Sequence, residues 1–369
     1  MKYVKGLSVC MIVKNEEKNI GVCIESLLGV ANEFVIVDTG SIDLTKTIIE
    51  SYRDRVEIQL VDFKWCDDFA AARNFGLPLA RYEWVLQFDA DERISRRDHD
   101  ILRKAISLKE WDSYRMIKRS YVNDPGLGWF IPRSSDDVYS ESQGWLGWTA
   151  EPNDLLFRNH EKLRYRSCIH ETITQSLADL KYRACWLNEV PIHHFGRFDM
   201  SSKEDKYLEL VKKRCREEDD AEAYNTLGAH YDWKKRSVEA VEAFLESLKR
   251  KPDYERPLYG LVISYYKLQK RKELYETASK LVSMSPTNYD LAWAYLVDEE
   301  FRRGNLREAI DWAQKAVDAN SSFFHVRYAL SCVLSAAAKN ELSQVLRILP
   351  QHSLAQKKFV YLDLCSSLI

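Results

Sequence analysis

The sequence predicts an α/β domain with a mixed, mostly parallel sheet at the N-terminus, followed by an all-α domain of superhelical repeats. Two observations support this division of the 369 residues. Over residues 1–92, apolar runs typical of buried strands alternate with amphipathic segments, which indicates a parallel sheet with crossover helices. From about residue 221, aromatic and small residues recur with a period of about 34 residues, which indicates paired helices. We therefore expect domains at residues 1–200 and 221–369, joined by a linker helix at 201–220.

The first domain begins with strand and helix units that can be read from their apolar patterns. Strands are expected where apolar residues run together and stop at polar residues, and helices where they fall at intervals of three and four. Asp43 is expected to cap the second helix. In chain order, the expected elements are the strand Leu7–Val13, a helix from Ile20 to Leu28, the strand Glu33–Val37, a helix with Leu44, Ile48 and Ile49, the strand Val56–Val61 and a short helix around Phe69–Leu79.

A fourth strand ends in two carboxylates. Residues 84–92 read WVLQFDADE, so Asp89 and Asp91 are expected at the C-terminal tip of a buried strand. Ligands bind at this edge of open α/β sheets. Two carboxylates one residue apart can hold a divalent cation, which can in turn hold a diphosphate. A surface turn is the alternative, because Asp is common where strands end. No GxGxxG motif follows the first strand, which argues against a dinucleotide oxidoreductase.

Four motifs in this order resemble family 2 glycosyltransferases of the GT-A fold. They are SVCMIVKNEE, FVIVDTGSIDLT, DDFAAARNFG and WVLQFDADE. The chain is most similar to the subset that joins such a domain to tetratricopeptide repeats, which includes the sublancin-type peptide S-glycosyltransferases. The resemblance implies a GT-A fold and a nucleotide-sugar donor, with a UDP-sugar favoured. The acceptor is not implied by these motifs.

The resemblance also implies contacts to the nucleoside of the donor. Val13, Asn15 and Glu16, at the end of the first strand, resemble the family's base and ribose contacts. Asp38, at the tip of the second strand, can accept the imide N–H of a uracil. Gly40 and Ser41 form a turn after this strand, and the glycine lets the backbone approach a ligand closely.

A second group of residues is expected at the diphosphate. Arg73 and Asn74 would direct a cation and an amide toward it. Asp89 and Ala90 complete the donor contacts that the resemblance implies. The alternatives are an ordinary surface ion pair for Arg73 and a capping role for Asn74.

An inverting transfer needs a base that deprotonates the acceptor while the diphosphate leaves from the opposite face. The segments LLFR at 155–158 and IHE at 169–171 resemble the acceptor-side strand pair of the family. Glu171 is the preferred base and His170 the alternative. A His and a Glu at a strand end can also simply hydrogen-bond their neighbours.

Two histidines lie in the segment VPIHHFGR, residues 190–197. The resemblance implies that His194 returns to the metal held by Asp89 and Asp91, with His193 as a structural neighbour. The expected cofactor is Mn²⁺ or Mg²⁺, and an imidazole ligand suits Mn²⁺ better. A histidine satisfied within the core is the alternative.

The segment Tyr121–Pro152 is an insert rich in glycine, proline and tryptophan. Trp129, Trp145 and Trp148 are expected on irregular loops, where exposure of their rings is unfavourable. Such loops either pack onto their own domain or form a lid over the acceptor.

The C-terminal region resembles tetratricopeptide repeats, with three registers of which the third is offset by one residue. Small residues at Ala240, Ala309 and Ala313 let paired helices approach closely. A fourth unit from about Phe324 is degenerate, as expected of a terminal cap. Such arrays bind peptides or another subunit on a concave surface, and the resemblance implies a homodimer through this region. Ser201–Asp220 is expected to be the linker helix, with Tyr207, Leu208, Leu210 and Val211 as its apolar stripe.

Composition excludes several classes of partner. A net charge of −2 provides no electrostatic footprint for nucleic acid. Eight cysteines without a CxxC pair, and no signal peptide, indicate reduced thiols in the cytoplasm. No apolar stretch reaches the roughly 20 residues that span a bilayer, so a membrane-embedded processive synthase is not expected.

The sequence therefore favours a metal-dependent inverting glycosyltransferase that moves one sugar to a peptide or protein side chain, Cys or Ser/Thr. A cell-surface glycan or lipid-linked saccharide is the alternative acceptor. A catalytically inactive repeat scaffold is the alternative of another class. The carboxylates and the histidine at the expected site argue against it: Asp38, Asp89, Asp91, Glu171 and His194.

Overall fold

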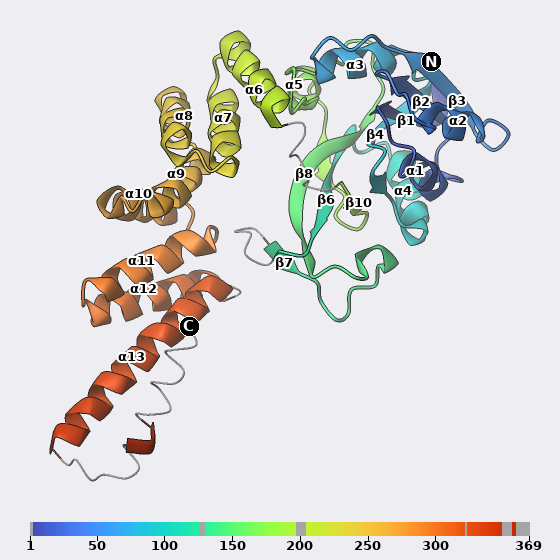
Figure 1. Ribbon diagram of the computed structural model, residues 1–369. Helices are drawn as coiled ribbons and strands as arrows, with labels where there is room; N and C mark the ends of the chain where they lie inside the picture. Colours follow the sequence, from blue (N-terminus) through green and yellow to red (C-terminus); the bar gives the residue numbers. More distant parts are fainter. Residues whose placement is uncertain (1–2, 125–129, 197–203, 322, 349–355, 359–369) are drawn as a thin grey trace. The chain divides into compact units, whose positions relative to one another are not determined.

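The computed structural model describes residues 3–124, 130–196, 204–321, 323–348 and 356–358 (Figure 1). The chain divides into two compact units, Met1–Arg214 and Cys215–Ile369. The sequence predicted the end of the first domain at residue 200, followed by a linker helix. That helix is α6 (Glu204–Glu218), and most of it belongs to the first unit.

The first unit alternates strands and helices up to residue 107, and mainly strands follow. Its elements are β1 (Val4–Val13), α1 (Ile20–Leu27), β2 (Glu33–Asp38), α2 (Thr45–Glu50), β3 (Glu57–Asp62), α3 (Phe69–Gly76), η1 (Leu77–Leu79), β4 (Tyr82–Gln87), β5 (Glu92–Arg93), η2 (Arg96–Asp98), α4 (His99–Ser107), β6 (Ser113–Val122), β7 (Phe130–Pro132), η3 (Ser140–Ser142), β8 (Gly147–Arg158), α5 (Thr174–Asp179), β9 (Ala184–Trp186), β10 (Ile192–His194) and α6.

Ten strands of the described chain form one mixed sheet. Eight follow the order β3-β2-β1-β4-β8-β6-β10-β5, while β7 pairs with β8 and β9 with β6. The first four in this order are parallel, because a helix crosses over between successive strands. β8 then runs antiparallel to both β4 and β6. The predicted fold class, a GT-A domain with a mixed sheet, is confirmed.

The strand register brings the expected site residues to one edge of the sheet. Val13 lies opposite Asp38 in the parallel pair of β1 and β2. Gln87, the last residue of β4, lies opposite Cys10 of β1, and Asp89 and Asp91 follow directly. The carboxyl ends of these three parallel strands therefore meet where ligands bind in such sheets.

Helices cover both faces of the sheet (Figure 1). On one face, Ile24 of α1 and Leu102 of α4 pack with Val9 of β1 in the largest core cluster of this unit. On the other face, Ala70 of α3 and Leu177 of α5 belong to a second cluster. Full burial of a side chain such as Ile24 stabilises the fold by roughly 2 kcal/mol, so α1 is held firmly beneath the site edge.

The start of α2 differs from the prediction that Asp43 caps it. α2 begins at Thr45 and its cap position is Leu44. The Asp43 carboxylate instead accepts hydrogen bonds from the backbone N–H of Thr45 at 3.0 Å and of Glu17 at 3.2 Å. Asp43 thus joins the turn after β1 to the turn after β2, which a capping pattern alone does not reveal.

The insert 121–152 is more regular than predicted, because β6 and β8 extend into it as a long antiparallel pair and β7 adds a short strand. Trp148 is 9% exposed, and Trp145 stacks on Tyr121 with ring centroids 5.9 Å apart. Of the two alternatives, these two tryptophans follow the one in which the insert packs onto its own domain. Trp129 lies outside the described residues.

The second unit is built from paired helices. They are α7 (Ala221–Trp233), α8 (Ser237–Arg250), α9 (Glu255–Lys267), α10 (Arg271–Met284), α11 (Asp290–Arg302), α12 (Leu306–Ala319) and α13 (Phe324–Ile348). The first helices of successive pairs start at residues 221, 255, 290 and 324, so the repeats are 34, 35 and 34 residues long. The predicted one-residue offset before the third repeat is therefore confirmed.

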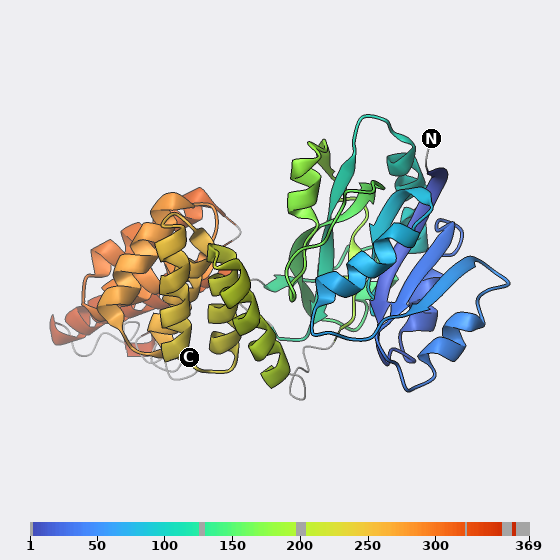
Figure 2. The same ribbon diagram turned by 90° about the horizontal axis from the view of Figure 1, so that it is seen from above.

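Successive helices of this unit pack side by side (Figure 2), and small residues let them approach closely. The ring of Phe244 in α8 fits between Gly228 of α7 and Gly260 of α9, where an added Cβ would lie 2.5 Å and 2.3 Å from ring atoms. Ala240 and Ala309 are fully buried, as predicted for close helix contacts. Within the described ranges, no helix is both long enough and apolar enough to cross a membrane.

Candidate active site

The turns that follow β1 and β2 are bound to each other. The backbone N–H of Asn15 donates to Ser41 Oγ at 2.9 Å, and Asn15 Oδ1 accepts from the N–H of Ile42 at 2.9 Å. Asn15 has a φ of 56°, which Asn tolerates better than most residues. The carbonyl of Val13 accepts from the N–H of Thr39 at 3.0 Å. The residues predicted to contact the nucleoside therefore form one continuous rim.

Glu16 belongs to the same rim. Its backbone N–H donates to Thr45 Oγ1 at 2.7 Å, and its carboxylate accepts from Asn19 Nδ2 at 2.8 Å. These bonds hold the carboxylate at the start of α1, beside the end of β1.

Asp38 lies at the tip of β2 and is fully buried. Its Oδ1 accepts hydrogen bonds from the backbone N–H groups of Gly40 and Ser41, each at 2.8 Å. Its Oδ2 is buried and has no hydrogen-bond partner among the described residues. An acceptor left in this state costs about 1–3 kcal/mol. Gly40 makes the turn possible, because its φ of +107° is strained for residues with a side chain.

A chain of alternating charges runs from Glu171 to Glu92. Arg73, which is 8% exposed, donates from Nε to Glu171 and from Nη2 to Asp89 at 2.7 Å. Lys118 of β6 lies 3.3 Å from the other oxygen of Asp89 and forms an ion pair with Glu92. Glu92 in turn accepts from the N–H of Asp89 at 2.9 Å. Asp89 is therefore held between two cations of the protein.

Burial and charge oppose each other along this chain. Burial would raise the pKa of Asp89, but the charges of Arg73 and Lys118 outweigh it and hold the pKa well below its usual range. Burial raises the pKa of Glu92 to about 7, with Lys118 opposing the shift. Burial would lower the pKa of Lys118, but the charges of Glu92 and Asp89 raise it instead. At neutral pH, Asp89 is ionised and both cations are charged.

Asp91 and His194 face each other at the other end of the site. His194 Nε2 lies 3.5 Å from Asp91 Oδ2, and Ser120 Oγ lies 2.8 Å from His194 Nδ1. Burial would lower the pKa of His194, but the hydrogen bond and charge of Asp91 raise it overall. Gly196 passes directly over both groups, since an added Cβ would lie 2.5 Å from His194 Nε2 and 2.6 Å from Asp91 Oδ2.

These two groups fit a shared divalent ion. Two ligands that are each about 2.1 Å from one ion lie no more than about 4.2 Å apart, and the pair meets that limit. Over the described ranges, no group of three or more His, Cys, Asp or Glu side chains is arranged to hold a metal. Because both oxygens of Asp89 face protein cations, the arrangement favours Asp91 over Asp89 as the ligand.

His193 lies next to the proposed ligand but has a different environment. It is fully buried, and Tyr121 Oη lies 2.6 Å from its Nδ1. Burial lowers its pKa to about 4, so the ring is neutral at pH 7. It stacks on Tyr121 with ring centroids 5.9 Å apart. This environment agrees with the predicted role as a structural neighbour.

The segment with His170 and Glu171 is a loop, whereas the sequence predicted a strand. The loop is closed by an isolated bridge between Arg166 and Thr172, and the carbonyl of Cys168 accepts from the N–H of Phe69 at 2.9 Å. His170 is exposed and has a φ of 52°. The loop therefore carries Glu171 into the site from the start of α3, without any strand pairing at Glu171.

Asn74 and Ala90 were predicted to contact the nucleotide-sugar donor, and the structure limits what each of them can offer. The Asn74 side chain donates to the carbonyl of Tyr165 at 2.9 Å and accepts from its N–H at 2.8 Å. This pairing takes up one N–H and the carbonyl oxygen of the amide, so we no longer assign Asn74 to the diphosphate. Ala90 is 5% exposed and packs in the main core, so only its backbone can meet a ligand.

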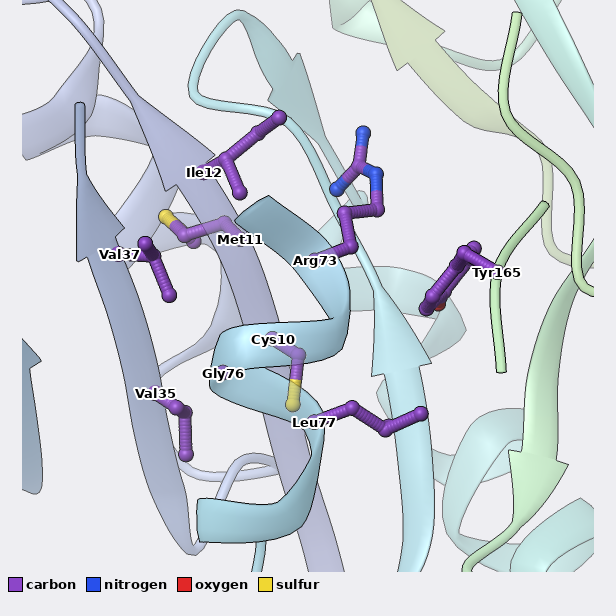
Figure 3. A pocket seen from close by; sticks show the side chains of 9 residues that line it. All are labelled: Cys10, Met11, Ile12, Val35, Val37, Arg73, Gly76, Leu77 and Tyr165. Atoms are coloured by element: carbon purple, nitrogen blue, oxygen red, sulfur yellow. The ribbon is translucent and has the colours of Figure 1, made fainter. Parts of the chain in front are cut away.

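A small cavity lies behind Arg73, between α3 and the strands β1 and β2 (Figure 3). Its volume of about 10 Å³ is enough for roughly one water molecule. It is lined by Cys10, Met11, Ile12, Val35, Val37, Arg73, Gly76, Leu77 and Tyr165. A nucleotide sugar cannot enter a space of this size, so the open edge of the sheet remains the place for substrate.

Sequence reasoning missed two residues of this site. Lys118 lies in the strand β6 with its side chain 13% exposed, and no local pattern in that strand singles it out. Tyr207 was assigned to the apolar stripe of a linker helix, yet its ring stacks on Phe69 in the first unit. No local motif marks either residue, because both reach the site through tertiary contacts.

Comparison with known proteins supports an enzyme. The family model described as "Glycosyl transferase family 2" matches residues 8–116. A TPR repeat-containing protein of Synechococcus elongatus is 28% identical over 52% of this chain and 42% of its own length. The SPbeta prophage-derived glycosyltransferase SunS of Bacillus subtilis is 27% identical over 44% of this chain and 33% of its own.

A third relative carries a different description. The lipopolysaccharide core biosynthesis glycosyltransferase LpsC of Rhizobium meliloti is 35% identical over 31% of this chain and 43% of its own length. The chain thus spans less than half the length of each of these relatives. The family match covers the strands whose ends build the candidate site, and paired helices follow that domain. Residues 8–116 are therefore similar to family 2 glycosyltransferases, and paired helices with a repeat of about 34 residues follow this domain.

Proposed function

We propose that this protein transfers a single sugar from a nucleotide-sugar donor, a UDP-sugar, to a peptide or protein side chain with inversion at the sugar. One observation carries the proposal. At the edge where β1, β2 and β4 end, three features lie together: a buried acceptor with no hydrogen-bond partner in the described part of the chain, a buried arginine and a carboxylate–imidazole pair. These groups match the three parts of such a donor: its base, its diphosphate and the ion that accompanies it.

The nucleoside is assigned to the rim of the two turns. Asp38 Oδ2 suits the imide N–H of a uracil, which would supply the hydrogen bond that the carboxylate lacks. Val13, Asn15, Glu16 and Ser41 are proposed to contact the base and ribose. A small movement of this rim is needed, because Asp38 is fully buried.

The proposed ion is Mn²⁺ or Mg²⁺, held by Asp91 and His194. The mixed oxygen and nitrogen donors suit Mn²⁺ better. When bound, the ion would neutralise charge on the departing diphosphate. Arg73 is proposed to add a fixed positive charge on the same side.

Glu171 is the proposed base. Its side chain is 11% exposed and is held by Arg73, which fixes the direction in which the carboxylate points. It would take the proton from the acceptor oxygen or sulfur as that atom attacks the sugar. His170 is the weaker candidate, because it lies exposed on the outer side of the loop.

The acceptor is proposed to be a Cys or Ser/Thr side chain, on the basis of the resemblance to sublancin-type enzymes. The repeats are proposed to capture the peptide and to form a homodimer. The cysteine content makes the cytoplasm the expected compartment. A saccharide acceptor is the second candidate, supported by the relative described in lipopolysaccharide core biosynthesis.

A direct assay tests these proposals. Purified full-length protein is incubated with UDP-glucose, UDP-galactose or UDP-N-acetylglucosamine and with Mn²⁺, Mg²⁺ or EDTA, and UDP release is measured. We expect metal-dependent release with at least one donor. Mass spectrometry with Cys- and Ser/Thr-containing peptides, and in parallel with lipopolysaccharide core saccharides, separates the two acceptor classes. No release from any nucleotide sugar would refute the proposed donor chemistry.

A further inference from the structure

The start of α6 belongs to the active-site half of the first unit. Lys206 forms an ion pair with Asp67 at 2.9 Å, just before α3. The carbonyl of Leu210 accepts a hydrogen bond from Cys168 Sγ at 3.5 Å, in the loop that carries Glu171. Leu210 is 5% exposed. This helix therefore binds both segments that supply Arg73 and Glu171.

Tyr207 lies between these two anchors, where it meets the site. Its ring stacks on Phe69, the first residue of α3, with centroids 6.0 Å apart and an interplanar angle of 27°. Within the described residues, its hydroxyl makes no hydrogen bond, while its ring is held by Phe69. Burial raises the pKa of Tyr207, and the negative charges of Glu171, Asp89 and Asp91 add to the shift. Tyr207 thus stays a neutral hydrogen-bond donor, and the residue it stacks on, Phe69, lies one helical turn before Arg73 in α3.

A bound sugar hydroxyl needs both a hydrogen-bond acceptor and a hydrogen-bond donor from the protein. A carboxylate can only accept a hydrogen bond, so a hydroxyl that donates to one still has lone pairs that require a donor. In this cluster Arg73 is already committed to Glu171 and Asp89. Tyr207 is a neutral donor at the start of α3, the helix that carries Arg73, and aromatic rings such as its own also pack against the apolar face of a sugar.

We propose that Tyr207 binds the transferred sugar, donating a hydrogen bond to one of its hydroxyl groups while its ring and that of Phe69 form one wall of the sugar subsite. The proposal rests on the proposed nucleotide-sugar donor and adds to it the residue that selects the sugar. It makes α6 part of the catalytic domain's substrate site and not only a connection to the repeats.

The test uses the full-length chain with three variants. Tyr207→Phe removes only the hydroxyl, Tyr207→Ala also removes the ring, and Tyr328→Phe is the matched control on α13, where Tyr328 is 57% exposed. Initial rates of UDP release are measured with UDP-glucose, UDP-galactose and UDP-N-acetylglucosamine. Calorimetry then measures the affinity of each variant for UDP itself, which has no sugar to be bound.

A sugar contact predicts a specific pattern. Tyr207→Phe should lower kcat/KM for the preferred donor about tenfold, the usual effect of one lost hydrogen bond, and should change the ranking or spacing of the three donors. Tyr207→Ala should lower it further. The UDP affinity of both variants should stay within about twofold of wild type, and Tyr328→Phe should match wild type in every measurement.

Other outcomes would overturn the proposal. If wild type is active and Tyr207→Phe releases UDP at the wild-type rate from all three donors, Tyr207 does not bind the sugar. If UDP affinity falls together with the rates, Tyr207 supports the fold and not the sugar. If wild type releases UDP from no donor, the proposed function fails, and the assignment of Tyr207 fails with it.

Discussion

Replacement of Arg73 tests the charge network most directly. Arg73→Gln removes the cation that Asp89 and Glu171 share and keeps a side chain of similar length. Removing one partner of a buried ion pair costs about 3–5 kcal/mol, because the remaining charge is buried without compensation. Glu171 is 11% exposed and would lose its arginine partner, whereas Asp89 is 32% exposed and would keep Lys118. We therefore expect Arg73→Gln to lower the free energy of unfolding by an amount near the lower limit, about 3 kcal/mol.

The loss should depend on pH in a defined direction. The folded-state pKa of Asp89 is depressed, so its ion pairs stabilise the protein fully above the ordinary Asp pKa of about 3.9. That contribution disappears as the pH falls through the folded-state pKa. The difference between wild type and Arg73→Gln should therefore be full at pH 7 and should shrink as the pH falls below about 4.

Hydrogen exchange in EDTA, read by mass spectrometry on peptides from α3 and β4, measures this loss. Two separate units make a single global unfolding curve hard to interpret, and local exchange avoids that problem. Arg53→Gln is the matched control. Its pair with Glu50 is 46% exposed on both sides, so it should cost no more than about 1 kcal/mol. If Arg73→Gln costs no more than Arg53→Gln at pH 7, the network does not stabilise the site as we describe.

Three further predictions concern the ion, the base and the repeats. Asp91→Asn and His194→Gln should each abolish metal-dependent UDP release while leaving α3 and β4 protected from exchange; full activity in EDTA would contradict the ion site. Glu171→Gln should lower turnover about a hundredfold or more, with UDP affinity by calorimetry unchanged; an undiminished rate would transfer the role to His170 or to an acceptor thiol, which ionises near pH 8.5 and needs less help. Gly228→Ala should destabilise the repeats by about 1–3 kcal/mol through its contact with Phe244, whereas Gly21→Ala in the first unit, whose nearest neighbours are 3.4 Å and 3.5 Å away, should be neutral or stabilising; hydrogen exchange of α7 and α8 at the wild-type rate in Gly228→Ala would refute the packing argument.

Much of the fold was predictable because its signals are local. The parallel strands are continuous apolar runs that end in polar turns, and Val13, Asp38 and Asp89 were placed at one edge from this pattern alone. The repeat period was predictable for the same reason, including the extra residue before α11. Each of these features is encoded within one element or at a fixed spacing.

The errors have a different origin. Asn74 was assigned to the diphosphate together with Arg73 from their helical spacing after Phe69, yet neighbours on a helix point in different directions and its amide meets the backbone of Tyr165. The segment around Glu171 was expected to be a strand because it resembles the acceptor-side strand pair of the family. It is a loop whose apolar residues pack beneath α3 and α6. For Asn74 and for the segment around Glu171, the sequence pattern indicated that the residues are buried but not which residues they contact.

The two carboxylates of the Asp89–Asp91 motif have different surroundings. Two carboxylates separated by one residue suggest a pair of metal ligands, and from the sequence they are equivalent. Lys118 and Arg73, which lie 29 and 16 residues from Asp89 in the chain, make them different by surrounding only the first. A carboxylate between two fixed cations already has its charge balanced, so a divalent ion gains less there than beside Asp91 and His194. Contacts with residues distant in the chain therefore give Asp89 and Asp91 different environments. Asp89→Asn should disturb the position of Arg73 and Glu171 more than the binding of metal.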